Sequence, residues 1–200
     1  MPSISNEQGV GMGNYVVESK EILQPINDEE SNHRFSLWYH PIYTNGIHPD
    51  ARFPRDRYTK LLERLKSPEH SNNFIIQQPT EASRNELILA HDPYYVDNFL
   101  NQNLTEKEIK RIGLTPWTPQ IVPRTLLLMG GAIAALDHVM EHGGIAGNMA
   151  GGTHHAHHDF GSGYCIFNDL AVCSILALSK YDVTKIAVVD FDVHQGDGTA

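Results

Sequence analysis

The second half of the chain alternates between long apolar helical patterns and short apolar runs. Residues 119–140 read as one helix, and its middle, LLLMGGAIAAL, is apolar on every side, which is typical of a buried helix. Gly130 and Gly131 cost helix propensity there but let another backbone come close. A strand at 145–149, a helix from 168 or 169 to about 179, and a strand at 185–190 follow. This alternation predicts an α/β fold with a parallel sheet covered on both faces.

The first half predicts shorter elements. Apolar runs that end before a proline predict strands at 35–39 and 74–76, because the residue before proline avoids the helical region. Apolar residues at helical spacing predict a helix over 56–66. Helical patterns also cover 81–89 and 93–100, and Thr105 to Glu108 reads as a capping box that opens another short helix.

Two polar segments lie at the last two predicted strands, one after the strand at 145–149 and one at the end of the strand at 185–190. They are GGTHHAHHDFGSGY, residues 151–164, and VVDFDVHQGDG, residues 188–198. Ligands of parallel sheets bind beyond the carboxyl ends of the strands. Carboxylates gathered at the end of a buried strand also need a partner that offsets their desolvation. We therefore interpret the two segments as two walls of one metal site.

Asp192 and His194 are the candidate metal ligands. Residues two apart in an extended chain face the same way, so Asp190 can point with them, while Phe191 and Val193 pack elsewhere. A carboxylate oxygen and an imidazole nitrogen are ordinary zinc ligands, and a catalytic zinc takes three protein ligands. A third ligand is therefore expected from elsewhere. The alternative is a solvated acidic loop after the strand, in which His194 only caps the loop and binds no metal.

His154 and His155 are the candidate proton-transfer groups. Adjacent histidines reach one point only on an irregular loop, and Gly151-Gly152 supplies that freedom. Two imidazoles beside a metal suit proton transfer to and from a metal-bound water. The alternative is a metal-free surface loop, or plain zinc affinity of a histidine cluster.

Each of these imidazoles needs a group on its other nitrogen that fixes the tautomer. Asp190 and Asp197 are spare carboxylates near the proposed metal and suit that role. His157 and His158 are read without a partner, as part of the surface-loop alternative. The seven remaining histidines, His91 among them, are read as structural or surface residues.

Gly163 and Tyr164 end a Gly-Ser-Gly turn beside the histidines. A glycine there lets a substrate pass close to the backbone, and an aromatic ring can line a narrow apolar slot. A simple turn with Tyr164 in the core is an equally good interpretation.

Composition narrows the classes of partner and compartment. The formal net charge is −9 and the pI is about 5.7, which argues against general binding to nucleic acid or to an anionic membrane. Two cysteines form no disulfide framework, so we expect an intracellular protein, in cytoplasm or nucleus. No secretory signal and no transmembrane run is visible. Residues 1–32 are rich in Ser, Asn, Gly and Glu, and we expect a mostly disordered tail.

The motifs resemble the histone deacetylase superfamily, which includes acetylpolyamine amidohydrolases and acetoin-utilisation proteins. The motifs are AGGTHHAHHDFGSGYCIFNDLAV (150–172), VVDFDVHQGDGTA (188–200) and, more weakly, RFPRDRYTKLLERL (52–65). Gln195 stands where many eukaryotic members have a histidine, so the sequence resembles the bacterial and class IV-like branches more closely. The resemblance implies an arginase-like three-layer α/β domain with a mainly parallel sheet, of which residues 33–200 form the N-terminal part.

The resemblance also implies a role for each residue of the motifs. The implied reaction is zinc-dependent hydrolysis of an acyl amide, chiefly an acetyl amide. The implied substrate is an acylated lysine of a protein, such as a histone in chromatin regulation, or a small acylated amine. Some relatives hold K⁺ near the first two aspartates of the run. The implied roles are zinc ligand for Asp192 and His194, general base for His155, electrostatic or acid group for His154, orienting carboxylate for Asp190 and Asp197, and channel wall for Gly163 and Tyr164.

The resemblance stops short of a complete site. The family takes its third zinc ligand, an aspartate, and its transition-state tyrosine from regions later than Ala200, so we expect a C-terminally truncated domain that alone binds zinc weakly and turns over little. One alternative is a dinuclear manganese ureohydrolase, but Gly196 stands where that chemistry wants a second carboxylate. Another is a non-catalytic fragment or binding remnant.

Overall fold

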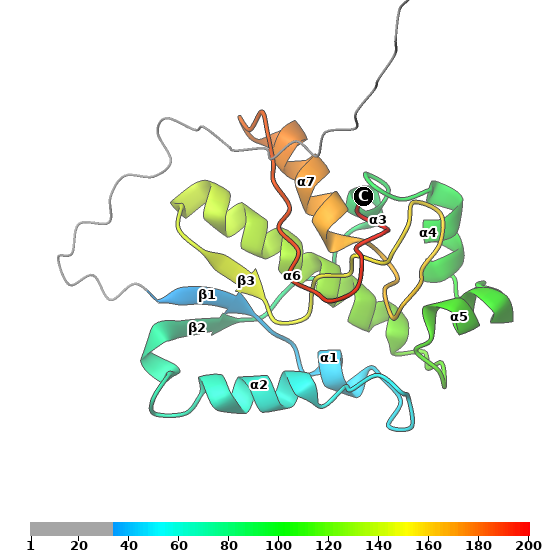
Figure 1. The fold of residues 1–200 in the computed structure, drawn as a ribbon, viewed down its shortest axis with the longest axis horizontal. Coiled ribbons are helices and arrows are strands. Elements are labelled where there is room, and N and C mark those ends of the chain that lie inside the picture. Colours follow the sequence, from blue (N-terminus) through cyan, green and yellow to red (C-terminus); the bar gives the residue numbers. More distant parts are fainter. Residues whose placement is uncertain (1–33) are drawn as a thin grey trace, which may run out of the picture.

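A computed structural model describes residues 34–200, so the predicted N-terminal tail lies outside the described residues. An α/β arrangement confirms the predicted class (Figure 1). The elements in chain order are β1 (Phe35–Trp38), α1 (Ile42–Asn45), α2 (Arg57–Leu65), the 3-10 turn η1 (Ser71–Asn73), β2 (Phe74–Gln77), α3 (Arg84–Leu87), α4 (Pro93–Leu100), α5 (Glu106–Ile112), α6 (Ile121–His142), β3 (Ala146–Asn148) and α7 (Asp169–Lys180).

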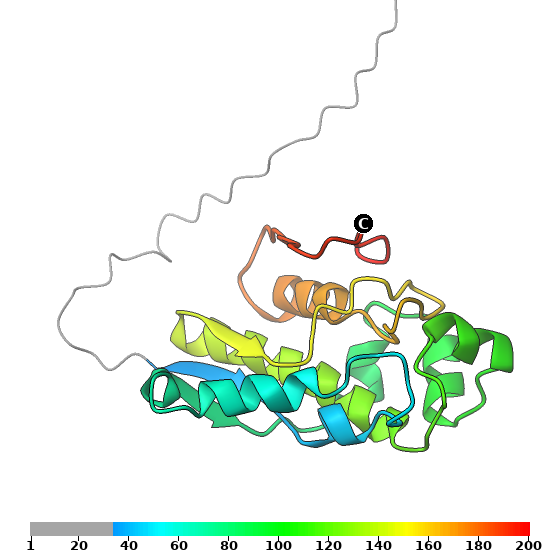
Figure 2. The ribbon, with the colours of Figure 1, turned by 60° about the horizontal axis from the view of Figure 1, so that its bottom comes forward.

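The sheet has three parallel strands in the order β2-β1-β3. Leu37, in the central strand, pairs with Ile76 on one side and with Gly147 on the other. Helix α6 packs against β1 and β3, and α7 packs against α6. Figure 2 shows residues 185–200, in red, running beside α7 at one side of the molecule. Within the described residues, no helix is both long enough and apolar enough to cross a membrane.

The predicted strand at 185–190 is wrong. Residues 185–190 pair with no strand in the described part of the chain, and Val189 is 70% exposed. Phe191 and Val193 do not pack elsewhere as expected, because they are 95% and 92% exposed. An apolar run becomes a strand only when a neighbouring strand supplies hydrogen-bond partners, and none of β1 to β3 lies beside this one. The second wall of the site is therefore an irregular segment.

Local capping signals set several helix boundaries. Thr105 and Glu108 form the predicted capping box of α5. A second box, Ser83 with Glu86, begins α3. The helix expected over 81–89 is thus shorter than predicted, since it begins only after Ser83 and lasts one turn.

The two glycines of α6 allow close packing, as predicted. A Cβ at Gly130 would overlap the carbonyl oxygen of Thr80, and one at Gly131 would lie 2.7 Å from both Asn148 Oδ1 and the Tyr43 hydroxyl. The buried core lies beside this helix. Its largest fully buried side chains include Tyr43, Phe99, Phe167, Ile47, Leu87, Ile112, Leu114, Ile121 and Met129.

Gly130→Ala should destabilise the fold although it improves helix propensity. The added methyl group meets backbone, which cannot move as a side chain can, and overpacking of this kind costs about 1–3 kcal/mol. Urea unfolding of the variant measures the loss. As a control, Ala134→Gly on the same helix removes a methyl group and should cost only about 1 kcal/mol of propensity. A more stable Gly130→Ala protein would contradict the close approach of Thr80.

Candidate functional site

The first residues of α7 hold the histidine loop in place. Asp169 accepts hydrogen bonds from the backbone N–H groups of Gly152 (2.9 Å) and Thr153 (2.8 Å) and from the Thr153 hydroxyl (2.7 Å). A carboxylate is favourable at this position because the helix N-terminus carries partial positive charge. The loop that carries His154 and His155 is therefore anchored immediately before the two histidines.

A second anchor is the buried imidazole of His91. The N–H of Asn168 donates to His91 Nε2 (2.8 Å), so His91 Nδ1 carries the proton and donates to the His157 carbonyl (2.9 Å). Asn168 in turn donates to the carbonyl of Ala156 (3.1 Å) and to the Thr199 hydroxyl (3.0 Å). The structural interpretation of His91 is thus correct, but the sequence did not show that it joins the histidine loop to α7.

Burial lowers the pKa of His91 to about 4, from an ordinary 6.5. The folded protein therefore keeps this imidazole neutral, while the unfolded chain takes up a proton below pH 6.5. We expect stability to be unaffected by His91 above pH 6.5 and to fall by at most roughly 3 kcal/mol between pH 6.5 and 4. Urea unfolding at pH 7.5, 5.5 and 4.5 measures this.

His91→Phe is the matched variant for the pH experiment, because the ring beside Tyr95 and Phe167 is kept. It should be less stable than the natural protein at pH 7.5, since two hydrogen bonds are lost. The stability difference between the two proteins should shrink as the pH falls to 4.5. A difference that stays constant with pH would show that His91 does not titrate in this window.

The two polar segments meet through two imidazole–carboxylate pairs. His154 Nδ1 lies 2.6 Å from Asp190 Oδ2, and His155 Nδ1 lies 2.7 Å from Asp197 Oδ1. The backbone N–H of Gly198 also donates to the His154 carbonyl (2.9 Å). With Nδ1 as the donor in each pair, Nε2 of each imidazole stays available to a substrate or a water.

These pairs also fix the charge state of the carboxylates. The hydrogen bond from His154 holds the pKa of Asp190 below its ordinary value. The bonds from His155 and then His157 do the same to the pKa of Asp197. The two imidazole rings lie with centroids 4.2 Å apart, so two adjacent imidazoles are each backed by an ionised carboxylate at neutral pH.

Asp192 and His194 lie together on the second wall. Asp192 Oδ1 accepts from the backbone N–H of His194 (2.7 Å), lies 2.8 Å from His194 Nδ1, and is 4.0 Å from His154 Nε2. The backbone N–H and then the imidazole of His194 lower the pKa of Asp192. Tight turns, in which the Asp192 N–H donates to Asp190 (2.9 Å), bring the side chains together instead of strand alternation.

The donor set of this wall fits zinc in part. One carboxylate oxygen and one imidazole nitrogen are typical zinc ligands, but a catalytic zinc takes three protein ligands. Among residues 34–200, no three His, Cys, Asp or Glu side chains are grouped so that they could hold a metal ion. That Asp192 and His194 supply two ligands of the three stays a prediction.

A cavity of about 390 Å³ opens at these residues. Gly163 and Tyr164 lie in its wall, and Tyr164 is 39% exposed, with its ring 5.4 Å from that of Phe53. Tyr164 therefore lies at the cavity and not in the core. A Cβ at Gly163 would come within 2.6 Å of the His155 ring, and its φ is +53°, so only glycine suits this position.

One histidine was assigned wrongly. The sequence indicates no partner for His157, but its Nε2 lies 3.3 Å from Asp197 Oδ2 and its ring stacks on Phe160, with the ring centroids 4.4 Å apart.

The sequence analysis did not identify Asp169 as an anchor of the histidine loop. Its place directly after the capping residue Asn168 is a local signal that could have indicated this role.

Comparisons with known proteins agree on one family. The histone deacetylase domain model matches residues 51–200. An uncharacterized protein of Picosynechococcus is 42% identical over 166 residues, which cover 83% of this chain and 55% of that protein. Acetoin utilization protein AcuC of Bacillus subtilis is 32% identical over 169 residues, 80% of this chain and 43% of AcuC. Histone deacetylase 2 of Arabidopsis thaliana is 28% identical over 158 residues, 76% of this chain and 40% of the relative.

The fold has a counterpart among solved structures. The crystal structure of the HDA15 HD domain matches with a TM-score of 0.68 at 19% identity, over 84% of this chain and 49% of that one. At this identity the match shows the fold alone. The chain spans about half the length of the curated relatives it matches.

Proposed function

Because the chain belongs to the histone deacetylase family, we propose that it carries part of the active site of a zinc-dependent hydrolase that removes acyl groups, acetyl among them, from lysine side chains or related amines. The observation that carries this proposal is the facing arrangement of the two walls. His154, backed by Asp190, and His155, backed by Asp197, line one cavity together with Asp192 and His194.

The proposed chemistry divides the site into a metal wall and a proton-transfer wall. Asp192 and His194 would hold the zinc ion, which when bound polarises the acyl carbonyl and lowers the pKa of a water. His155 takes the proton of the attacking water at Nε2, while Asp197 at Nδ1 fixes the tautomer and stabilises the imidazolium. His154, backed by Asp190, stabilises the charge that develops beside it or returns a proton to the leaving amine.

The family and the cavity support the proposed substrate class. Tyr164 and Gly163 would flank an acyl-lysine chain, with Phe53 across from Tyr164. The proposed substrate is an acylated lysine of a protein, histones included, or a small acylated amine. We place the reaction in the cytoplasm or the nucleus. We propose that the protein has no direct nucleic-acid or membrane partner. We also propose that a structural K⁺ ion binds near Asp190 and Asp192.

Zinc stoichiometry and hydrolysis together test the proposal. A form that includes the rest of the family domain should bind one zinc per chain and release acetate from an acetyl-lysine peptide. Two manganese ions with hydrolysis of a guanidinium substrate would indicate a ureohydrolase instead. A protein that binds no metal and has no activity would indicate a non-catalytic fragment or a domain that has kept only a binding role.

The 200-residue chain provides a separate test. Its described residues offer two zinc ligands, so we expect weak zinc binding and little or no turnover from it. Robust zinc-dependent deacetylation by this chain alone would contradict the part of the proposal that places the third ligand outside residues 1–200.

A further inference from the structure

Arg124, on α6, is a buried cation without an acidic partner. The side chain is 4% exposed, its Nε donates to the Tyr43 carbonyl (3.0 Å), and its Nη2 donates to the Tyr58 hydroxyl (3.2 Å). In the part of the chain that the structure describes, the arginine–carboxylate pairs are those of Arg55, Arg64 and Arg84. Two neutral acceptors leave the guanidinium charge uncompensated, which is costly inside a protein.

A second guanidinium lies beside it. Arg57, on α2, donates to the same Tyr58 hydroxyl (3.2 Å) and lies over the Phe53 ring, 4.5 Å from its centroid. Burial first, and also the neighbouring charge of Arg57, lower the pKa of Arg124. Two cations that share one phenol repel each other, so an anion between them would stabilise both.

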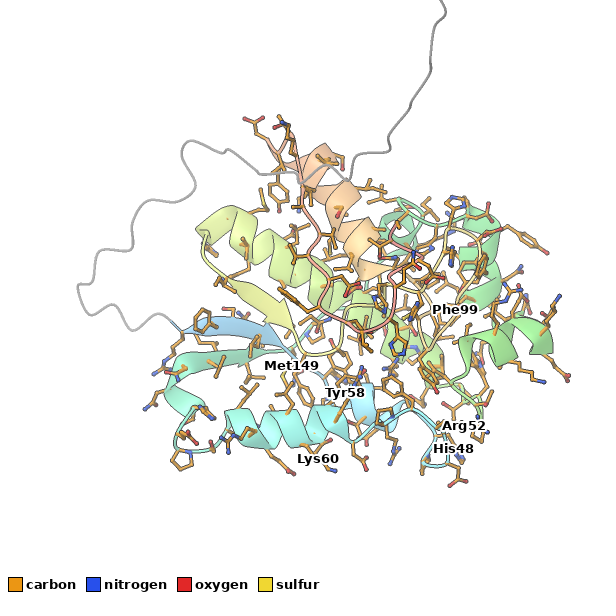
Figure 3. All side chains as sticks on the ribbon, viewed as in Figure 1. His48, Arg52, Tyr58, Lys60, Phe99 and Met149 are labelled. Atoms are coloured by element: carbon orange, nitrogen blue, oxygen red, sulfur yellow. The ribbon has the colours of Figure 1, made fainter. Side chains whose placement is uncertain are left out.

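Both arginines line the cavity of the candidate site. The same cavity is lined by Asp192 and His194 of the proposed metal wall, and the apolar side chain of Leu128 also lines it. Figure 3 shows Tyr58 on the side of α2 that faces the body of the molecule, and Lys60 on the outer side. The cavity therefore joins an acidic, metal-binding wall to a basic wall formed by α2 and α6.

We propose that Arg124 and Arg57, with the Tyr58 hydroxyl, form a carboxylate-binding site, and that the preferred acyl group is a short dicarboxylic one, such as succinyl or glutaryl. The preference rests on the proposed amide hydrolysis. The scissile amide would lie at Asp192 and His194, the methylene groups beside apolar side chains, and the terminal carboxylate at Arg124. The fork of a guanidinium matches a carboxylate, and charge-assisted bonds of this kind are about twice as strong as neutral ones. An acetyl group would leave Arg124 uncompensated.

Direct binding to the 200-residue chain tests the site without metal or turnover. Calorimetric titrations would use Nε-glutaryl-lysine, Nε-succinyl-lysine, Nε-acetyl-lysine and acetate. We expect one of the two dicarboxylic ligands to bind at least tenfold more tightly than acetyl-lysine and than acetate. Arg124→Gln should remove this advantage, and Arg57→Gln should reduce it. Arg64→Gln, an exposed arginine of the same helix α2 paired with Glu69, is the control and should change nothing.

Each other outcome has a defined meaning. The proposal would be overturned if neither dicarboxylic ligand binds more tightly than acetyl-lysine. It would also be overturned if acetate binds as tightly as the better of the two, because the site would then hold a free carboxylate and no acyl tail. Circular dichroism checks that Arg124→Gln folds. If it does not, Arg57→Gln and Tyr58→Phe decide, and unchanged binding in both overturns the proposal. A further outcome is that the dicarboxylic ligands bind in an arginine-dependent way, while a longer form loaded with zinc hydrolyses none of the acyl-lysines. This outcome would refute the proposed function but not the carboxylate-binding site.

Discussion

His155→Ala should lower the kcat of the proposed acyl-amide hydrolysis by about 10²–10⁴-fold, the usual contribution of a positioned general base, and should leave zinc bound. The imidazole is held by Asp197 at 2.7 Å through Nδ1, which leaves Nε2 free to accept a proton. The experiment measures turnover of an acetyl-lysine peptide and zinc content, on a form that includes the rest of the family domain. Loss of zinc from the variant would show that His155 is a ligand and not a base.

His157→Ala is the matched control for this prediction. Its imidazole shares Asp197 with His155 but at a longer distance, 3.3 Å, and it is not among the residues that line the cavity. We expect a kcat reduction of no more than about tenfold, because the Asp197 carboxylate loses only its weaker partner. Equal effects of the two substitutions would mean that the carboxylate network, and no single imidazole, carries the proton transfer.

Asp192→Ala should differ from His155→Ala in that it should lose zinc from the proposed metal site. Removal of a direct ligand should weaken zinc binding by more than the about 10–100-fold that loss of an outer-shell partner costs. Asp192 lies on an exposed turn, so the fold should be unaffected. Competition with a chelating dye measures the affinity, and circular dichroism checks the fold.

Asp182→Ala is the control for the metal experiment, since Asp182 is an exposed aspartate outside the cavity. Its zinc affinity should equal that of the natural protein. Unchanged zinc binding in Asp192→Ala would mean that the wall formed by residues 188–198 does not hold the metal, and the hydrolase proposal would lose its central assumption.

The sequence by itself determined the elements that depend on neighbours in the chain. The capping box at Thr105 and the apolar pattern of α6 act within one or two turns. Helix α5 therefore begins at the predicted capping box, and α6 lies within two residues of its predicted bounds. The sequence also predicted which two segments lie together at the site. Histidines and aspartates gathered in two short segments cannot all be buried without common partners, and the structure brings both segments to one cavity. Their catalytic and metal-binding roles remain predictions.

Only the tertiary structure decided what depends on residues far apart in the chain. The apolar run at 185–190 is strand-like in sequence but unpaired, because no neighbouring strand lies beside it. His91 anchors a loop that follows it by more than sixty residues, and no local pattern shows such a bond. Arg124 lies in an apolar helix pattern, and only packing against Tyr43 and Tyr58 places its charge at the cavity. Strand pairing, burial of a charge and cavity shape are set by three-dimensional contacts, which the order of residues along one segment does not specify.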